Sequence, residues 1–164
     1  MLYLIDANTL IRADADYYPI DRVPQFWDWL QERAEGGDIK MPFEIFSEVC
    51  RGKGALPDWL SDKNVEEALV LDEEVDATHF QKVVEQGYAS DLTDEEIEQI
   101  GADPFLAAYA LTAPSNRTVV TKETSRPRAK RQNRKLPDVC SDFGVRWITD
   151  FVLYKELDFR IGAT

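Results

Sequence analysis

The sequence is poor in histidine and cysteine, the side chains on which many hydrolytic and metal sites depend. His79 is the only histidine, which excludes a ribonuclease with two catalytic histidines and a His-Glu-x-x-His zinc site. Cys50 and Cys140 stand far apart, without the spacing of a zinc cluster or a disulfide framework. Any hydrolytic chemistry in this chain therefore has to depend on carboxylates.

Long apolar runs are also missing. A membrane-spanning helix needs roughly 18 consecutive apolar residues, and no stretch approaches that length. At the amino terminus an acid, Asp6, interrupts the apolar run before the core of a signal peptide could form. We therefore expect no membrane partner and a cytoplasmic location.

The formal net charge of −12 opposes long-range attraction to nucleic acid, but the charges are unevenly distributed. Residues 58–103 hold fifteen Asp or Glu against two Lys, whereas residues 122–135 hold seven Lys or Arg against a single acid, Glu123. The sequence predicts an acidic side and a basic segment, which we define as residues 122–135.

The length of 164 residues suits a single domain, which we place at residues 1–164. Strand patterns alternate with helix patterns along the chain, which predicts an α/β fold with a mostly parallel sheet of four or five strands. Strands are expected at residues 2–5, 39–41, 118–121 and 145–148. Helices are expected at 23–34, 42–51, 103–111, 137–143 and 150–157. Two or three acidic helices are expected between 57 and 99, around 59–69, around 75–85 and from Thr93, where Thr93 to Glu96 resembles a capping box.

Candidate site residues lie where the strands are expected to end. Asp6 directly follows the first apolar run, and Glu123 follows Val119 and Val120 after two intervening residues. Functional sites of parallel α/β sheets lie beyond the carboxyl ends of the strands. Asp103, before Pro104, is expected to cap a helix and still to expose one carboxylate oxygen.

These segments resemble the PIN-domain family over nearly the whole chain. The matching phrases are Ile5-Asp6-Ala7-Asn8, Pro42 with Ser47-Glu48-Val49, Ala102-Asp103, and Val119 to Glu123, with Leu136 to Cys140 typical of a less-studied branch. The resemblance implies a three-layer α/β/α sandwich, a ribonuclease that uses Mg²⁺ or Mn²⁺, and Asp6, Glu48 and Asp103 as the central acids. Asn8 and Thr121 would orient Asp6 and a metal-bound water.

The chemistry of such a cluster favours a hard cation. Carboxylates within about 4 Å of one another repel by roughly 4 kcal/mol per pair at an effective dielectric near 20, unless protons or cations intervene. Mg²⁺ takes oxygen ligands and keeps several waters. The fourth acid stays open between Glu123, which stands where PIN domains usually carry Asp, and Asp138.

The basic segment is a candidate RNA-binding surface. Its cations follow the expected metal strand directly, and they are Lys122, Arg126, Arg128, Lys130, Arg131, Arg134 and Lys135. We expect their affinity for single-stranded RNA to fall as salt rises.

Other functions fit less well or stay open. Haloacid-dehalogenase phosphatases use Asp-x-Asp after the first strand, and Asn8 stands at their second position. A PIN-like module that binds a protein or RNA without turnover is the stronger rival. The family resemblance also implies the toxin of a bacterial toxin–antitoxin pair, with an antitoxin protein and a homodimer as partners.

Overall fold

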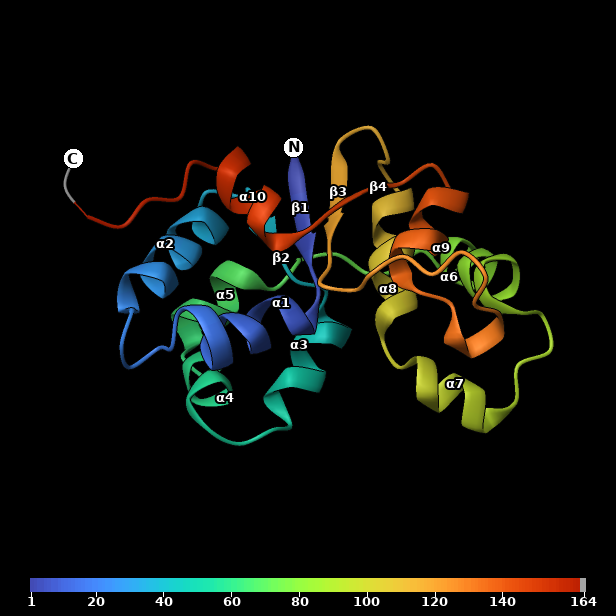
Figure 1. The fold of residues 1–164 in the computed structure, drawn as a ribbon, viewed down its shortest axis with the longest axis horizontal. Helices are drawn as coiled ribbons and strands as arrows, with labels where there is room; N and C mark the ends of the chain where they lie inside the picture. Colours follow the sequence, from blue (N-terminus) through green and yellow to red (C-terminus); the bar gives the residue numbers. More distant parts are fainter. Residues whose placement is uncertain (163–164) are drawn as a thin grey trace.

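The computed structural model of the protein describes residues 1–162 and forms a helix-rich α/β fold (Figure 1). The strands are β1 (Leu2–Ile5), β2 (Ile39–Lys40), β3 (Arg117–Val120) and β4 (Arg146–Ile148). The α-helices are α1 (Ala7–Arg12), α2 (Pro24–Glu35), α3 (Phe43–Cys50), α4 (Ala55–Leu60), α5 (Lys63–Leu69), α6 (Ala77–Lys82), α7 (Asp94–Ile100), α8 (Asp103–Leu111), α9 (Leu136–Asp142) and α10 (Asp150–Glu156). Three short helices, whose turns are wider or tighter than those of an α-helix, are η1 (Ala13–Tyr17), η2 (Val83–Tyr88) and η3 (Arg131–Asn133).

The four strands form one parallel sheet in the order β2-β1-β3-β4. Leu4 pairs with Lys40 on one side and with Val119 on the other, and Val119 pairs in turn with Trp147. The predicted parallel sheet is confirmed. Because all strands are parallel, their carboxyl ends lie at one edge, the edge from which α1 leaves β1 in Figure 1.

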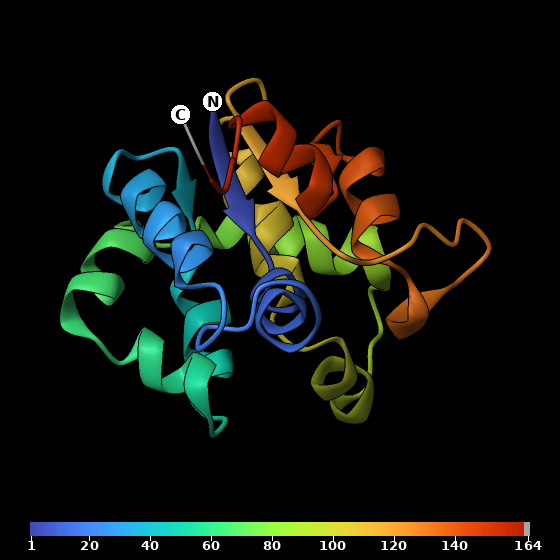
Figure 2. The same cartoon turned by 60° about the vertical axis from the view of Figure 1, so that its left-hand side comes forward.

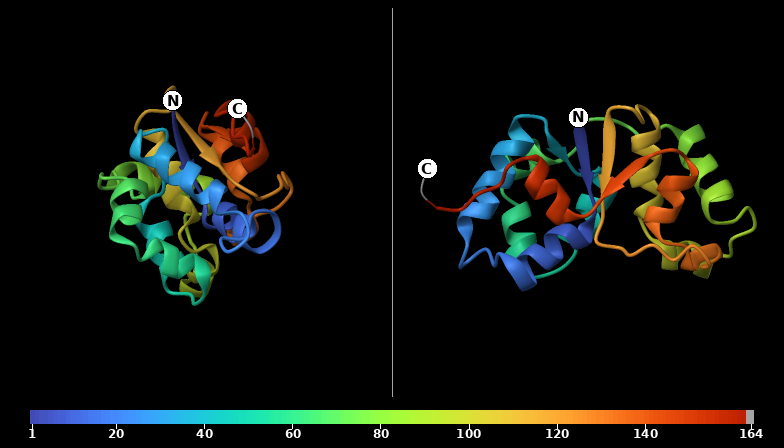
Figure 3. Two further views of the ribbon diagram at one scale, coloured as in Figure 1. Left: turned by 90° about the vertical axis from the view of Figure 1, so that its left-hand side faces the viewer. Right: turned by 45° about the horizontal axis from the view of Figure 1, so that its top comes forward.

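Helices cover both faces of the sheet and complete the expected three layers. On one face α8 packs against β1 and β3, and α9 packs against β4 and α8. The views in Figures 2 and 3 place α10 on the other side of the strands from α8. There α10 meets α2 through aromatic side chains, with Phe26 5.3 Å from Tyr154 between ring centroids.

The apolar runs form the core because each strand is buried between two helical layers. Leu4, Ile5, Val119 and Val120 are fully buried. Helix α2 begins at Pro24 and ends at Gly36, and α7 has the expected capping box between Thr93 and Glu96. These local signals placed most elements correctly.

The structure differs from the sequence prediction at three places. The segment after Asp6 forms α1 and η1, for which no helix was predicted. The expected helix across residues 59–69 is two helices, α4 and α5, because Asp62 caps a new start through Asn64 N and Val65 N. Asp103 is the first residue of α8 and makes no capping hydrogen bond, since Ala102 holds the cap position.

No helix within residues 1–162 combines the length and the apolar character needed to cross a membrane.

Candidate functional site

The candidate site lies at the carboxyl edge of the sheet between β1 and β3. The chain leaves β1 toward β2 on one side and later returns to β3 on the other, so this is the point at which the winding of the sheet reverses. Ligands of open parallel sheets bind at such a point. Asp6 ends β1 there, and Thr121 to Glu123 follow β3.

The Asp6 carboxylate is buried and held by three hydrogen bonds. Thr9 donates to Oδ1 through its backbone N, at 2.8 Å, and through its hydroxyl, at 2.7 Å. The backbone N of Lys122 donates to Oδ2 at 3.2 Å. These contacts fix the orientation of the Asp6 carboxylate. Burial raises the pKa of Asp6, and hydrogen bonds from Thr9, Thr121 and Lys122 oppose the rise.

Asp103 is the acid on which the other charges converge. Burial is the main cause that raises the pKa of its carboxyl group to about 7. The negative charges of Glu123, Asp6 and Glu48 raise it further, in that order, and Lys135 opposes them. These four acids come from separate segments of the chain, and the structure brings them into one electrostatic neighbourhood.

Glu48 reaches this neighbourhood from α3. A Cβ atom added at Gly101 would lie 3.6 Å from Glu48 Oε1, so the carboxylate lies against the turn that leads into α8. Gly101 has a φ of +66°. That conformation suits glycine, and it directs the chain toward Asp103.

The two candidates for the fourth acid have different surroundings. Glu123 lines a hollow of about 140 Å³ together with Asp103, and its charge acts on Asp103. Asp138 accepts from the Ser125 hydroxyl at 2.5 Å and from the backbone N of Arg126 at 2.7 Å. The charge of Glu123 therefore acts within the acid cluster around Asp103, whereas the described hydrogen bonds of Asp138 go to residues 125 and 126.

The oxygen donors and their mutual charge suit Mg²⁺ or Mn²⁺, but the acids are looser than the contact at about 4 Å that we expected. Within residues 1–162, no three His, Cys, Asp or Glu side chains converge closely enough to hold one ion directly. Mg²⁺ commonly uses one or two carboxylates and keeps several waters. A cation at this site would therefore have to be held by one or two of these acids together with waters.

The basic segment divides into two groups of cations. Three cations pair with acids of the protein itself: Lys122 pairs with Asp150, Arg131 with Asp91 and Glu96, and Arg134 with Asp142. Four have no side-chain partner in the described part of the chain, and they are Arg126, Arg128, Lys130 and Lys135. Lys135 lines the same hollow as Asp103 and Glu123.

The residues expected to orient Asp6 are only partly in place. Thr121 is buried, and its hydroxyl accepts from the backbone N of Glu123 at 3.1 Å. Asn8 is exposed and has no hydrogen bond to Asp6 among the described contacts. Thr9 takes that position instead. The sequence signal that could have identified Thr9 is its position three residues after an Asp that caps a helix.

Asp150 was also missed as a member of this edge. It stands one residue beyond the position after β4 that corresponds to Asp6 after β1, and its side chain is fully buried beside Lys122. The strand-end rule that selected Asp6 applies equally to Asp150. The prediction applied it to two strands only.

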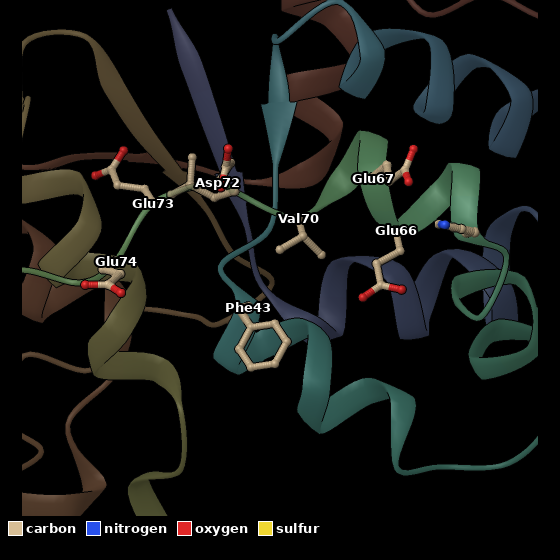
Figure 4. Close-up of a pocket in the computed structure, with 9 residues that line it drawn as sticks. Phe43, Glu66, Glu67, Val70, Asp72, Glu73 and Glu74 are labelled. Carbon is tan, nitrogen blue, oxygen red and sulfur yellow. The ribbon is translucent and has the colours of Figure 1, made fainter.

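A larger groove lies elsewhere on the protein. It has a volume of about 810 Å³ and is lined by Phe43, Val70 and Leu71 together with Lys63, Glu66, Glu67, Asp72, Glu73 and Glu74. Figure 4 shows Val70 above the ring of Phe43, with the Glu66 carboxylate beside them. Five carboxylates against one lysine would repel phosphates, so this groove is no candidate for RNA binding.

Comparison with known proteins identifies a family but no characterised relative. No curated protein and no solved structure matches the chain. One family matches residues 3–161, which is nearly the whole chain. The protein therefore belongs to the family described as "Domain of unknown function (DUF4411)".

Proposed function

We propose that the protein is a PIN-like endoribonuclease that cleaves RNA phosphodiester bonds with Mg²⁺ or Mn²⁺. Its acids would be Asp6, Glu48, Asp103 and Glu123. The observation that carries the proposal is that Asp103 and Glu123 line one hollow at the carboxyl edge of the sheet, where burial and three neighbouring carboxylates raise the pKa of Asp103. Such an arrangement is costly for the protein alone and favours a bound cation.

One or two of these acids, with waters, would hold the cation. The cations of the basic segment that have no side-chain partner among the described residues, Arg126, Arg128, Lys130 and Lys135, would hold the RNA. A bound Mg²⁺ or Mn²⁺ supplies an activated water and screens the charge that develops on phosphorus. Asp6 is oriented by Thr9 and Lys122, and its carboxylate and that of Asp103 would be ligands of the cation. Lys135 lines the same hollow as Asp103 and would hold a phosphate oxygen.

The test is cleavage of labelled single-stranded RNA and transfer RNA by the purified protein. We expect cleavage with Mg²⁺ or Mn²⁺, none with EDTA, and none in Asp6→Asn. Asp94→Asn is the matched control, because Asp94 is an exposed acid in the first turn of α7. Equal activity in the wild type and Asp6→Asn would overturn the proposal.

The alternative is a PIN-like binding module for a protein or RNA, without turnover. The looseness of the acids within the described residues favours it. RNA binding that persists in EDTA, with no cleavage under any divalent cation, would select this alternative.

We further propose that the protein is a cytoplasmic toxin with an antitoxin partner and a homodimeric state. The acidic groove in Figure 4 supports a protein partner, since its carboxylates complement a basic segment. Co-purification with the product of an adjacent gene tests the antitoxin. Light scattering of the purified protein tests the dimer.

A further inference from the structure

The Lys122 ammonium group lies in an enclosed site that is unsuited to RNA binding. Its Nζ atom lies 3.1 Å from Asp150 Oδ1 and 3.3 Å from the Tyr17 hydroxyl. The same atom lies 4.9 Å from the ring centroid of Tyr17 and 4.7 Å from that of Phe151. The lysine side chain is only 19% exposed, so its charge interacts with groups of the protein and is not available to RNA.

Asp150 depends on this lysine. Its side chain is fully buried at the start of α10, where Oδ1 also accepts from the backbone N of Phe151 at 2.9 Å. Asp150 Oδ2 is buried and has no hydrogen-bond partner among the described residues. A buried carboxylate without a partner is strongly unfavourable. The ion pair with Lys122 therefore holds the start of α10 against the chain just after β3.

The backbone of the same lysine contacts the candidate site. Lys122 N donates to Asp6 Oδ2, and Asp6 N donates to Val120 O at 3.0 Å. The next residue along the chain is Glu123, whose charge acts on Asp103. One residue therefore joins a buried ion pair through its side chain to the Asp6 carboxylate through its backbone.

We infer that the Lys122–Asp150 pair is a positioning device that fixes the end of β3, and with it the carboxylates of Asp6 and Glu123. Lys122 thus acts through its neighbours and does not bind RNA. The inference rests on the proposed function where it concerns the cation, whereas the fixing of Asp6 is a property of the protein without metal.

The experiment uses Lys122→Met, Asp150→Asn and the double variant of the full chain. Methionine keeps the length and the contact with the two rings, and asparagine keeps the hydrogen bond to Phe151 N. Lys122→Met alone leaves Asp150 buried and unpaired, so its melting temperature falls, and the double variant recovers part of the loss. The control is the double variant Arg146→Met/Glu156→Gln, which removes an ion pair between the start of β4 and the end of α10.

Two measurements separate positioning from a merely structural role. The first is hydrogen exchange of the amide of residue 122 in the metal-free protein, followed by NMR. In the double variant we expect exchange to be about tenfold faster or more, since the end of β3 is no longer fixed, and no change in the control. The second is the dissociation constant for Mn²⁺, which we expect to rise about tenfold in the double variant and to stay unchanged in the control.

The outcomes are distinguishable. If the amide of residue 122 exchanges at the wild-type rate in the double variant, the inference that the ion pair is a positioning device is wrong. If the double variant keeps the wild-type affinity for Mn²⁺, the ion pair does not affect the cation site. If the wild type binds no Mn²⁺, the proposed function fails, and the exchange measurement still decides whether the ion pair fixes Asp6.

Discussion

The backbone amide of Leu136 donates a hydrogen bond of 2.7 Å to Glu123 Oε2. One oxygen of this carboxylate is therefore held at the start of α9. The other oxygen has no hydrogen-bond partner among residues 1–162 and belongs to a side chain that lines the hollow with Asp103. Glu123 thus combines a fixed orientation with an oxygen available to a ligand.

The first prediction concerns the choice between Glu123 and Asp138. Glu123→Gln is expected to weaken Mn²⁺ binding about tenfold or more, because it removes a charge from the acid cluster. Asp138→Asn is expected to leave the affinity unchanged, since both Asp138 oxygens hold residues 125 and 126. It should instead lower the free energy of unfolding by about 1–3 kcal/mol. Calorimetric titration and urea denaturation check the two effects, and the reverse pattern would make Asp138 the fourth acid.

The second prediction concerns pH and Asp103. Its pKa is about 7 in the folded protein and about 4 in the unfolded chain, so below about pH 4 both states are protonated and the group has no effect on stability. As pH rises from about 4 to about 7, the unfolded chain ionises more readily than the folded one, and the metal-free protein loses stability. The contribution of Asp103 therefore makes the metal-free protein less stable at neutral pH than in mild acid.

Asp103→Asn removes this dependence. In EDTA at about pH 8, the variant should be more stable than the wild type by about 2 kcal/mol, after allowance for partial exposure of the side chain. The difference should vanish near pH 4, and Mg²⁺ should stabilise the wild type more than the variant. Urea denaturation at several pH values checks this, and a variant less stable at pH 8 would contradict it.

The sequence predicted the fold well because the relevant signals are local. Apolar runs such as residues 2–5 become buried strands, and Pro24, Gly36 and Thr93 mark helix ends through backbone chemistry that needs no distant partner. Asp6 was selected by the same local logic, since an acid directly follows a strand buried on both faces.

What the sequence could not reveal depends on contacts between distant segments. The pairing of Lys122 with Asp150 spans 28 positions, and that of Arg131 with Glu96 spans 35. Such partners decide whether a cation in a basic run is free or engaged. Likewise, Asp103 looked like a helix cap, and only the folded structure shows the burial, and the nearby charges of Glu123, Asp6 and Glu48, that raise the pKa of its carboxyl group.

The third prediction tests the turn at Gly101. Its φ of +66° is unfavourable for alanine, and Gly101→Ala should cost about 1–3 kcal/mol of stability. Gly37→Ala is the matched control, because Gly37 has a φ of +85° and lies far along the chain from the acids. Both variants should be destabilised, but only Gly101→Ala should weaken Mn²⁺ binding, since relaxation of this turn moves Asp103 and the contact with Glu48. Equal Mn²⁺ affinity in the two variants would show that the turn does not set the site.

The fourth prediction separates the free cations of the basic segment from the engaged ones. With four free cations in contact with phosphates, log affinity for single-stranded RNA should fall with log salt at a slope of about −3. Arg128→Gln/Lys130→Gln should halve that slope to about −1.4, because two phosphate contacts are lost. Arg131→Gln/Arg134→Gln should leave the slope unchanged and lower stability, since these arginines pair with Glu96 and Asp142. Fluorescence anisotropy over a KCl series, in an Asp6→Asn background that prevents cleavage, measures the slopes. Equal slopes in both double variants would mean that pairing within the protein does not decide which cations reach the RNA.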